Sequence, residues 1–355
     1  MLQLFCFTFA VLLSVMCFAQ NIAYYSDYMG RLHVFDNGQF YTPEHQSFKN
    51  ISLGGSYIIY EDALNQLVRF QDGKKQILDY SPSSQFFTPT RYLLLNRMQR
   101  ALTVYEGQKR KTVALGNSEN YALGDSILAF TDFDRFLKAY HDGETHDVTN
   151  ESIVSYKTGD NTVAYINIAE ALEVYYKGEV AEVSNYLPKE YEVGNNFVAY
   201  VNQFDELWVY DAGKNTQMKR AKRWESGDNC LAYIDQNDIF WFYFDGKSEE
   251  LSQVAPKDFW IIDNTLVYID NRNFFNVVYQ GKNHLLETYA PPKWHMFNGI
   301  VAYLDLNGRV KAFYEGEKLE VSTEVVNDFN LQGRVILYEI NNKETKIFFN
   351  KKKFN

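Results

Sequence analysis

The chain has 355 residues, of which 46% are hydrophobic and 23% charged, and its formal net charge is −10. This much apolar material excludes an intrinsically disordered chain. The acidic balance disfavours a protein that binds nucleic acid through its overall field, and the basic runs 109–111 and 219–223 are interpreted as solvated loop charge. No nucleic-acid partner is therefore predicted.

Residues 1–19, MLQLFCFTFAVLLSVMCFA, are uncharged and almost wholly apolar. Ala19, followed by Gln20, resembles a signal-peptidase site, although no Lys or Arg precedes the apolar run. We predict a signal peptide over residues 1–19 and a single repeat domain over 20–355 that is exported, periplasmic or extracellular, with no membrane span after cleavage. An uncleaved anchor is the alternative. Cleavage leaves Cys230 as the one cysteine, in an apolar strand, where a buried and inert thiol is expected.

A glycine then recurs with a period of about 35 residues, each time two or three residues after an aromatic. The series is Gly38, Gly73, Gly107, Gly143, Gly178, Gly213, Gly246, Gly281 and Gly316. A tenth copy without its glycine occupies the C-terminal residues. The chain is therefore predicted to be a tandem array.

One unit, residues 156–183, shows what is repeated. Residues 163–166 (VAYI) are apolar on both faces, as a strand packed between two sheets requires, and residues 172–176 (LEVYY) form a second β-rich run. Lys177-Gly178 is typical of a hairpin turn with positive φ, and residues 180–183 follow as a third strand. A fourth strand opens on a periodic aromatic that we expect to lie buried between units; the series is Phe86, Tyr121, Tyr156, Tyr191, Trp224, Phe259, Trp294 and Phe329.

Four short antiparallel strands per unit are typical of one propeller blade. The predicted fold is all-β, a β-propeller of about ten blades, with one ring favoured and two five-bladed rings left open. Counted from the strand that opens on the periodic aromatic, the first copy begins at its second strand, near Ile22, so the C-terminal end is expected to help close the ring.

The stretch from Trp224 to Gly246 resembles the repeat of TolB-type propellers, which carry a W-S-P-D-G turn, an I-A-F strand and a final D-G. Trp224, Ala232 and Tyr233 match the Trp and Ala-Phe positions, whereas Gly227-Asp228-Asn229 replaces Pro-Asp-Gly. The resemblance implies a propeller fold over nearly the whole chain. It implies no activity, because such blades serve several functions.

No catalytic signature is found: the chain lacks a G-x-S-x-G elbow, an H-E-x-x-H motif, a P-loop and a dinucleotide fingerprint. His141 and His146 flank a turn, where polar turn residues are favoured over a metal site. We predict a protein that is not an enzyme and that has no cofactor.

An Asp or Asn follows the central aromatic of each unit by two residues. The series is Asp27, Asp62, Asn96, Asp132, Asn167, Asn202, Asp235, Asp270 and Asp305. A binding rim or a ring of cation ligands is one interpretation. Side-chain capping of equivalent turns is favoured, because a feature present in every unit is usually structural.

Binding is expected where the units differ, in the loops that follow these Asp and Asn residues. Aromatic side chains beside arginines are typical of protein-contact hot spots. The candidate residues are Tyr28, Arg31, Phe133, Arg135, Phe204, Arg272 and Phe274. The predicted function is a non-catalytic binding or scaffolding module with a protein partner, or a polysaccharide, in the cell envelope. The alternative is a polysaccharide lyase or hydrolase.

Overall fold

The computed structural model describes residues 20–80, 84–87, 93–97, 101–107, 109–115, 120–341 and 344–354. The predicted signal peptide lies outside these ranges. Within them the chain consists of strands and connections without any helix, so no described helix is long and apolar enough to cross a membrane.

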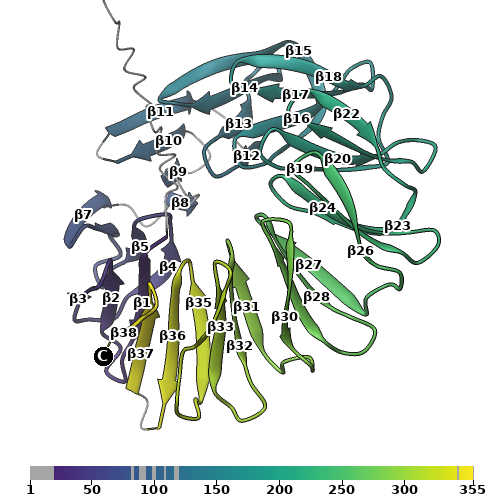
Figure 1. The fold of residues 1–355 in the computed structure, drawn as a ribbon. Helices are drawn as coiled ribbons and strands as arrows, with labels where there is room; N and C mark the ends of the chain where they lie inside the picture. Colours follow the sequence, from purple (N-terminus) through teal and green to yellow (C-terminus); the bar gives the residue numbers. More distant parts are fainter. Residues whose placement is uncertain are drawn as a thin grey trace, which may run out of the picture.

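The strands fall into nine antiparallel sheets, one of which holds two blades, so the described chain has ten blades (Figure 1). Blade 1 contains β1 (Ile22–Ser26), β2 (Leu32–Asp36) and β3 (Gln39–Glu44), and blade 2 contains β4 (Lys49–Leu53), β5 (Ile58–Glu61), β6 (Leu67–Gln71) and β7 (Lys74–Asp79). Blade 3 contains β8 (Ser84–Phe87), β9 (Leu93–Arg97), β10 (Ala101–Glu106) and β11 (Lys109–Leu115), and blade 4 contains β12 (Tyr121–Leu123), β13 (Leu128–Thr131), β14 (Phe136–His141) and the first part of β15 (Glu144–Thr158). Blade 5 contains the second part of β15 with β16 (Thr162–Asn167), β17 (Leu172–Tyr176) and β18 (Glu179–Ser184).

Blades 6 to 10 repeat one four-stranded order. Blade 6 contains β19 (Glu190–Val193), β20 (Phe197–Val201), β21 (Leu207–Asp211) and β22 (Lys214–Gln217), and blade 7 contains β23 (Ala221–Ser226), β24 (Cys230–Asp235), β25 (Phe240–Phe244) and β26 (Lys247–Ser252). Blade 8 contains β27 (Asp258–Ile262), β28 (Thr265–Ile269), β29 (Phe275–Tyr279) and β30 (Lys282–Glu287), and blade 9 contains β31 (Trp294–Phe297), β32 (Ile300–Leu304), β33 (Val310–Tyr314) and β34 (Glu317–Glu320). Blade 10 contains β35 (Asp328–Gln332), β36 (Val335–Ile340), β37 (Glu344–Phe349) and β38 (Lys352–Phe354).

The core consists of ten apolar clusters, each between two neighbouring blades. Alternation along the strands explains this: Ala164 and Val174 of blade 5 pack against blade 6, whereas Val163 and Tyr175 point the other way and pack against blade 4. The periodic aromatics contribute to these clusters. Tyr191, Phe259 and Phe329 are buried, while Tyr156, Trp224 and Trp294 are half-buried against them. Tyr121 likewise packs against the cluster between blades 3 and 4. The prediction of inter-blade packing is confirmed for these seven residues; the side chain of Phe86 lies outside the described part.

When the strand that carries the periodic aromatic is counted as the first of each blade, the periodic glycines close the hairpin between the third and fourth strands. In blade 5, Lys177 and Gly178 have φ angles of 49° and 90°, which are the values of a type I′ turn. The tenth copy makes the same turn without glycine, through Asn350 and Lys351 at φ 48° and 62°. The predicted turn chemistry is confirmed.

The two ends of the described chain lie side by side, where the first and last sheets meet (Figure 1). Phe35 of blade 1 contacts Phe349 and Phe354 of blade 10, and Val335 and Leu337 belong to the same cluster. This tenth cluster closes one ring of ten blades and settles the alternative of two five-bladed rings.

Candidate functional site

The antiparallel strand order divides the connections between two ends of the ring. The turns between second and third strands share one end with the segments that lead to the next blade, and we call this end the loop face. The first-to-second and third-to-fourth turns share the other end, which we call the glycine face. Hydrogen bonds agree with this division. Lys189 lies in the segment just before the first strand of blade 6, and its Nζ donates to Asp205 in the second-to-third turn of the same blade at 2.5 Å.

Eight of the loop-face turns in the described chain are each built around an Asp or Asn. Asp235 Oδ1 accepts the N–H groups of Asn237 and Ile239 at 2.8 and 3.0 Å, and its Oδ2 accepts Trp241 Nε1 at 3.0 Å. Burial raises the pKa of this carboxyl, but these hydrogen bonds outweigh it and hold the pKa below its ordinary value. The paired Oδ1 bonds recur at Asp27, Asp62, Asp132, Asn167, Asn202, Asp270 and Asp305. The capping interpretation is confirmed for these eight; the side chain of Asn96 lies outside the described part.

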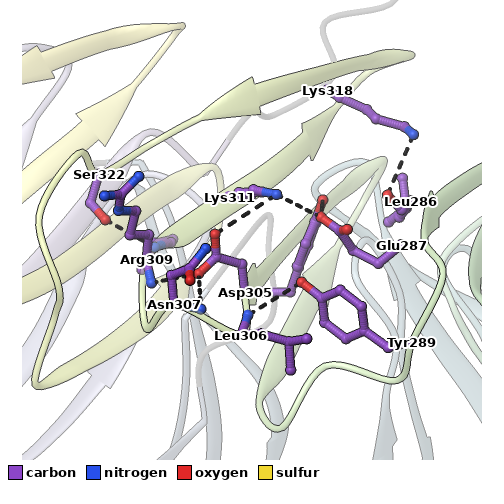
Figure 2. Close-up of polar contacts among 12 residues, drawn as sticks. Leu286, Glu287, Tyr289, Asp305, Leu306, Asn307, Arg309, Lys311, Lys318 and Ser322 are labelled. Atoms are coloured by element: carbon purple, nitrogen blue, oxygen red, sulfur yellow. Dashed lines mark hydrogen bonds and ion pairs between the residues drawn. The ribbon is translucent and has the colours of Figure 1, made fainter.

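Figure 2 shows how firmly one such turn is held, in blade 9. Asp305 Oδ1 accepts the N–H groups of Asn307 and Arg309, and Lys311 Nζ lies 3.8 Å from its Oδ2. Lys311 also donates to Glu287 Oε1 of blade 8 at 2.9 Å, and this hydrogen bond is the main reason that the pKa of Lys311 is raised. The turn is thereby fixed to the neighbouring blade.

The tips of these rigid turns carry apolar side chains that point into solvent. Tyr28 is 82% exposed, Phe133 is 78% exposed and Phe204 is 60% exposed. Four further exposed side chains occupy equivalent turns: Met29, Leu64, Ile168 and Leu306. The segments between blades add more at the same end: Tyr80, Val154, Tyr186, Leu187, Val254 and Val325. The loop face therefore presents a discontinuous apolar rim.

Among the other predicted site residues, Arg31 and Arg272 contact neighbouring side chains, and Phe274 is half-buried. Arg31 forms an ion pair with Asp27 at 2.6 Å. The guanidinium of Arg272 lies 4.5 Å from the ring centre of Phe274, which is half-buried. Arg135 is exposed, in a left-handed conformation with φ 64°. The seven predicted residues come from blades 1, 4, 6 and 8, so they share a face of the ring but form no single pocket.

Two cavities open beside the turn of blade 4. One of about 490 Å³ is lined by Arg135 with Tyr121, Ile153, Val154 and Tyr156, and another of about 140 Å³ is lined by Leu115, Phe130 and Phe133. Sequence reasoning missed the aliphatic members of the rim and the contribution of the segments between blades. Their position one or two residues after each capping Asp or Asn is the signal that would have identified the aliphatic turn residues.

The glycine face is tightly packed by comparison. A Cβ atom on Gly159 would lie 2.2 Å from the carbonyl oxygen of Gly194, and Gly124, Gly194 and Gly227 meet the next blade as closely. The adjoining Asp160 and Asp228 have raised pKa values of about 6 and about 7, first because of burial and then because of repulsion from Asp125 and Asp263. These carboxyls come from different blades that the ring brings together.

Within the described ranges no group of three or more His, Cys, Asp or Glu side chains is placed to hold a metal ion. His141 and His146 stack with ring centres 4.3 Å apart, and His141 Nε2 lies 2.8 Å from the hydroxyl of Tyr175. Cys230 is buried, and this burial raises the pKa of its thiol.

Solved structures with similar folds include Prp20p from Saccharomyces cerevisiae, with 8% identity and a TM-score of 0.35 over 56% of this chain and 72% of that one. The CRINKLY WD40 ectodomain of the Arabidopsis thaliana receptor kinase ACR4 has 10% identity and a TM-score of 0.35, over 68% and 95%. The computationally designed Ika8 protein has 12% identity and a TM-score of 0.32, over 74% and 95%. At these scores the likeness carries no argument about function.

No curated protein matches the sequence. The family model that matches is described as a 10-bladed beta propeller domain, and it covers residues 16–354. Nothing in the comparisons is specific to the TolB-type repeat, so that resemblance holds only at the level of the propeller. β-Propellers often serve as binding modules. The chain belongs to the family of ten-bladed β-propeller domains.

Proposed function

We propose that this protein is an exported, non-catalytic binding module that presents its loop face to a protein partner in the cell envelope. The observation that carries the proposal is the difference between the two faces. Turn tips of the loop face carry Tyr28, Phe133 and Phe204, whereas the equivalent positions of the glycine face carry mostly polar residues such as Lys177 and Asp245. An excess of exposed apolar side chains on one face over the other supports an interaction site on that face.

The fold does not require these apolar groups. The capping Asp or Asn holds each turn through backbone N–H groups, so the side chain at the tip contributes nothing to its geometry. Asn271 and Gln236 occupy tip positions in blades 8 and 7, which shows that polar residues fit there. Because the turns are rigid before binding, little conformational entropy is lost when a partner docks.

A protein partner suits the rim better than a polysaccharide does. Tyr28, Phe133 and Phe204 could stack on sugar rings, but the rim also contains the aliphatic side chains of Leu64 and Ile168. Aliphatic groups favour an apolar protein surface over hydroxyl-rich sugars. The rim therefore supports protein binding first, with a polysaccharide as the competing ligand.

The test compares two triple variants in capture experiments with envelope proteins from the native cells. Tyr28→Ser, Phe133→Ser and Phe204→Ser together should reduce capture of a specific partner at least about tenfold, because exposed aromatic anchors carry most interface energy. The melting temperature should stay within about 2 °C, since these side chains have few contacts to lose. Phe274 is left unchanged because it is half-buried.

The matched control changes the glycine face, with Lys177→Asn, Asp245→Asn and Gln280→Asn. Asn tolerates the positive φ of these positions, so the fold is preserved. Capture that survives the loop-face changes but is lost in the control would refute the proposal. Cleavage of a polysaccharide library by the purified protein would favour the enzyme alternative instead.

A further inference from the structure

Blade 1 differs from the other blades at its inner edge. Its described strands are β1, β2 and β3, and β1 pairs only with β2. In the other blades a first strand covers this edge. In blade 8, for example, Phe259 of the first strand lies opposite Tyr268, and the residue equivalent to Tyr268 in blade 1 is Tyr25. An open strand edge displays unpaired N–H and C=O groups that can pair with another chain.

Within the described part of the chain, one side chain takes the place of a first strand at this edge. Gln332 of blade 10 accepts the N–H of Tyr24 through Oε1 at 2.8 Å and donates from Nε2 to the Tyr24 carbonyl at 3.0 Å. A carboxamide that makes both bonds copies one rung of a β-ladder. The outward groups of Tyr24 are therefore placed for strand pairing.

A cavity of about 180 Å³ lies beside this edge, at the seam between blades 10 and 1. Its apolar walls are Tyr24, Tyr25, Phe329 and Leu337. At the seams that lead into blades 6, 8 and 10, an aromatic of the first strand is buried at the corresponding position; Phe259, for example, is fully buried between blades 7 and 8. The cavity thus lies where an aromatic of a first strand of blade 1 would pack.

The charge that blade 10 presents at this seam is opposite to the charge at the seams that follow blades 7 and 9. Arg223 of blade 7 donates to Asp258 and to the Phe259 carbonyl in the next blade, at 2.6 and 3.0 Å, and Lys293 of blade 9 likewise reaches blade 10. Blade 10 instead presents Asp328, which already bonds Lys293, and Glu339, opposite Asp328 in the sheet. An occupant with a basic side chain matches these carboxylates.

We propose that this seam binds an extended segment of a partner protein by β-strand addition. The segment pairs antiparallel to β1, displaces the Gln332 carboxamide from Tyr24, inserts an aromatic side chain into the cavity and places Lys or Arg beside Glu339. The chain's own residues 15–18 (VMCF) contain no basic residue. The inference rests on the proposed function only in that residues 1–19 are removed on export.

The experiment uses the protein purified from its native cells, with its N-terminus sequenced, and fluorescent peptides measured by anisotropy. A Thr-Lys-Phe-Thr-Val-Thr peptide should bind, whereas versions with Glu for Lys or with Pro for the central Thr should bind at least about tenfold more weakly. Gln332→Ala should tighten binding severalfold, because it frees the Tyr24 edge. Glu339→Lys should reverse the preference between the Lys and Glu peptides, and this charge swap cannot result from misfolding.

Three results would overturn the proposal. The first is no binding of the Lys peptide at concentrations up to about 100 μM, and the second is equal binding of all three peptides. The third is tighter binding of a peptide with the sequence of residues 14–19, which would assign the seam to the chain's own N-terminal segment. The loop-face triple variant should bind the Lys peptide normally. Failure of the seam proposal and failure of the proposed function are thereby distinguished.

Discussion

Replacing Asp228 by Asn should make the protein more stable at neutral and alkaline pH. The Asp228 carboxyl lies in the glycine face, where burial and then the charges of Asp263, Asp160 and Asp125 raise its pKa to about 7. An unfolded chain has the ordinary aspartate pKa of about 3.9. Between these values the folded state holds a proton that the unfolded state has lost, so stability falls as pH rises from about 4 to about 7.

The size of the effect follows from this difference in pKa. A shift of about three pH units corresponds to about 4 kcal/mol at full effect. Asp228 is only half-buried, so solvent screens its charge and lowers the effect on the free energy of unfolding. We expect about 2 kcal/mol. Asn should fit the turn, because Asn195 occupies the same position in blade 6 and its N–H bonds the Asp228 carbonyl at 2.8 Å.

The assay is thermal unfolding of the wild type and of Asp228→Asn from pH 4 to pH 8. The two proteins should melt together at pH 4, and the variant should melt about 3 °C higher at pH 8. Asp134→Asn, which removes an exposed carboxylate from the loop face, is the control and should leave the curves parallel. A variant that is less stable at every pH, or a difference that does not grow with pH, would refute the reasoning.

Two further predictions concern the turns. Gly159→Ala should lower the free energy of unfolding in urea by about 3 kcal/mol or more, because its Cβ would clash with the carbonyl of Gly194. Gly178 has a φ of 90° and open space around it, so Gly178→Ala should cost only about 1–2 kcal/mol. Equal costs would contradict the inter-blade contact. Asp235→Ala should cost about 3 kcal/mol in the same assay, because two N–H groups and Trp241 Nε1 lose their acceptor, and Asp235→Asn about 1 kcal/mol. A neutral Asp235→Ala would show that the capping bonds do not stabilise the turn.

The repeating features of the fold could be predicted because they are local. A pair such as Lys177-Gly178 determines its own turn type, and Asp235 caps a turn with N–H groups only two and four residues away. The closed single ring could not be predicted in the same way. Closure requires Phe35 of blade 1 to contact Phe349 of blade 10, which depends on the total rotation added up over all the blades. A local sequence pattern does not determine that total.

The candidate site divides along the same line. Tyr28, Phe133 and Phe204 are exposed because each follows a capping residue directly or by two positions, at the tip of the turn. Phe274 is four positions after Asp270, where the chain re-enters the sheet, and it is half-buried for that reason. Asp228 of blade 7 and Asp125 of blade 4 interact because closure of the ring brings these blades together, so the sequence alone did not predict this interaction.

The most direct test of the loop-face account is photo-crosslinking in the native cells. The photo-reactive amino acid p-benzoylphenylalanine would replace Phe133 or Phe204 on the loop face and, in parallel, Lys177 or Asp245 on the glycine face. The account predicts one recurrent protein adduct from both loop-face positions and none from the glycine-face positions. Adducts that form only from Lys177 or Asp245, or equally from both faces, would contradict it.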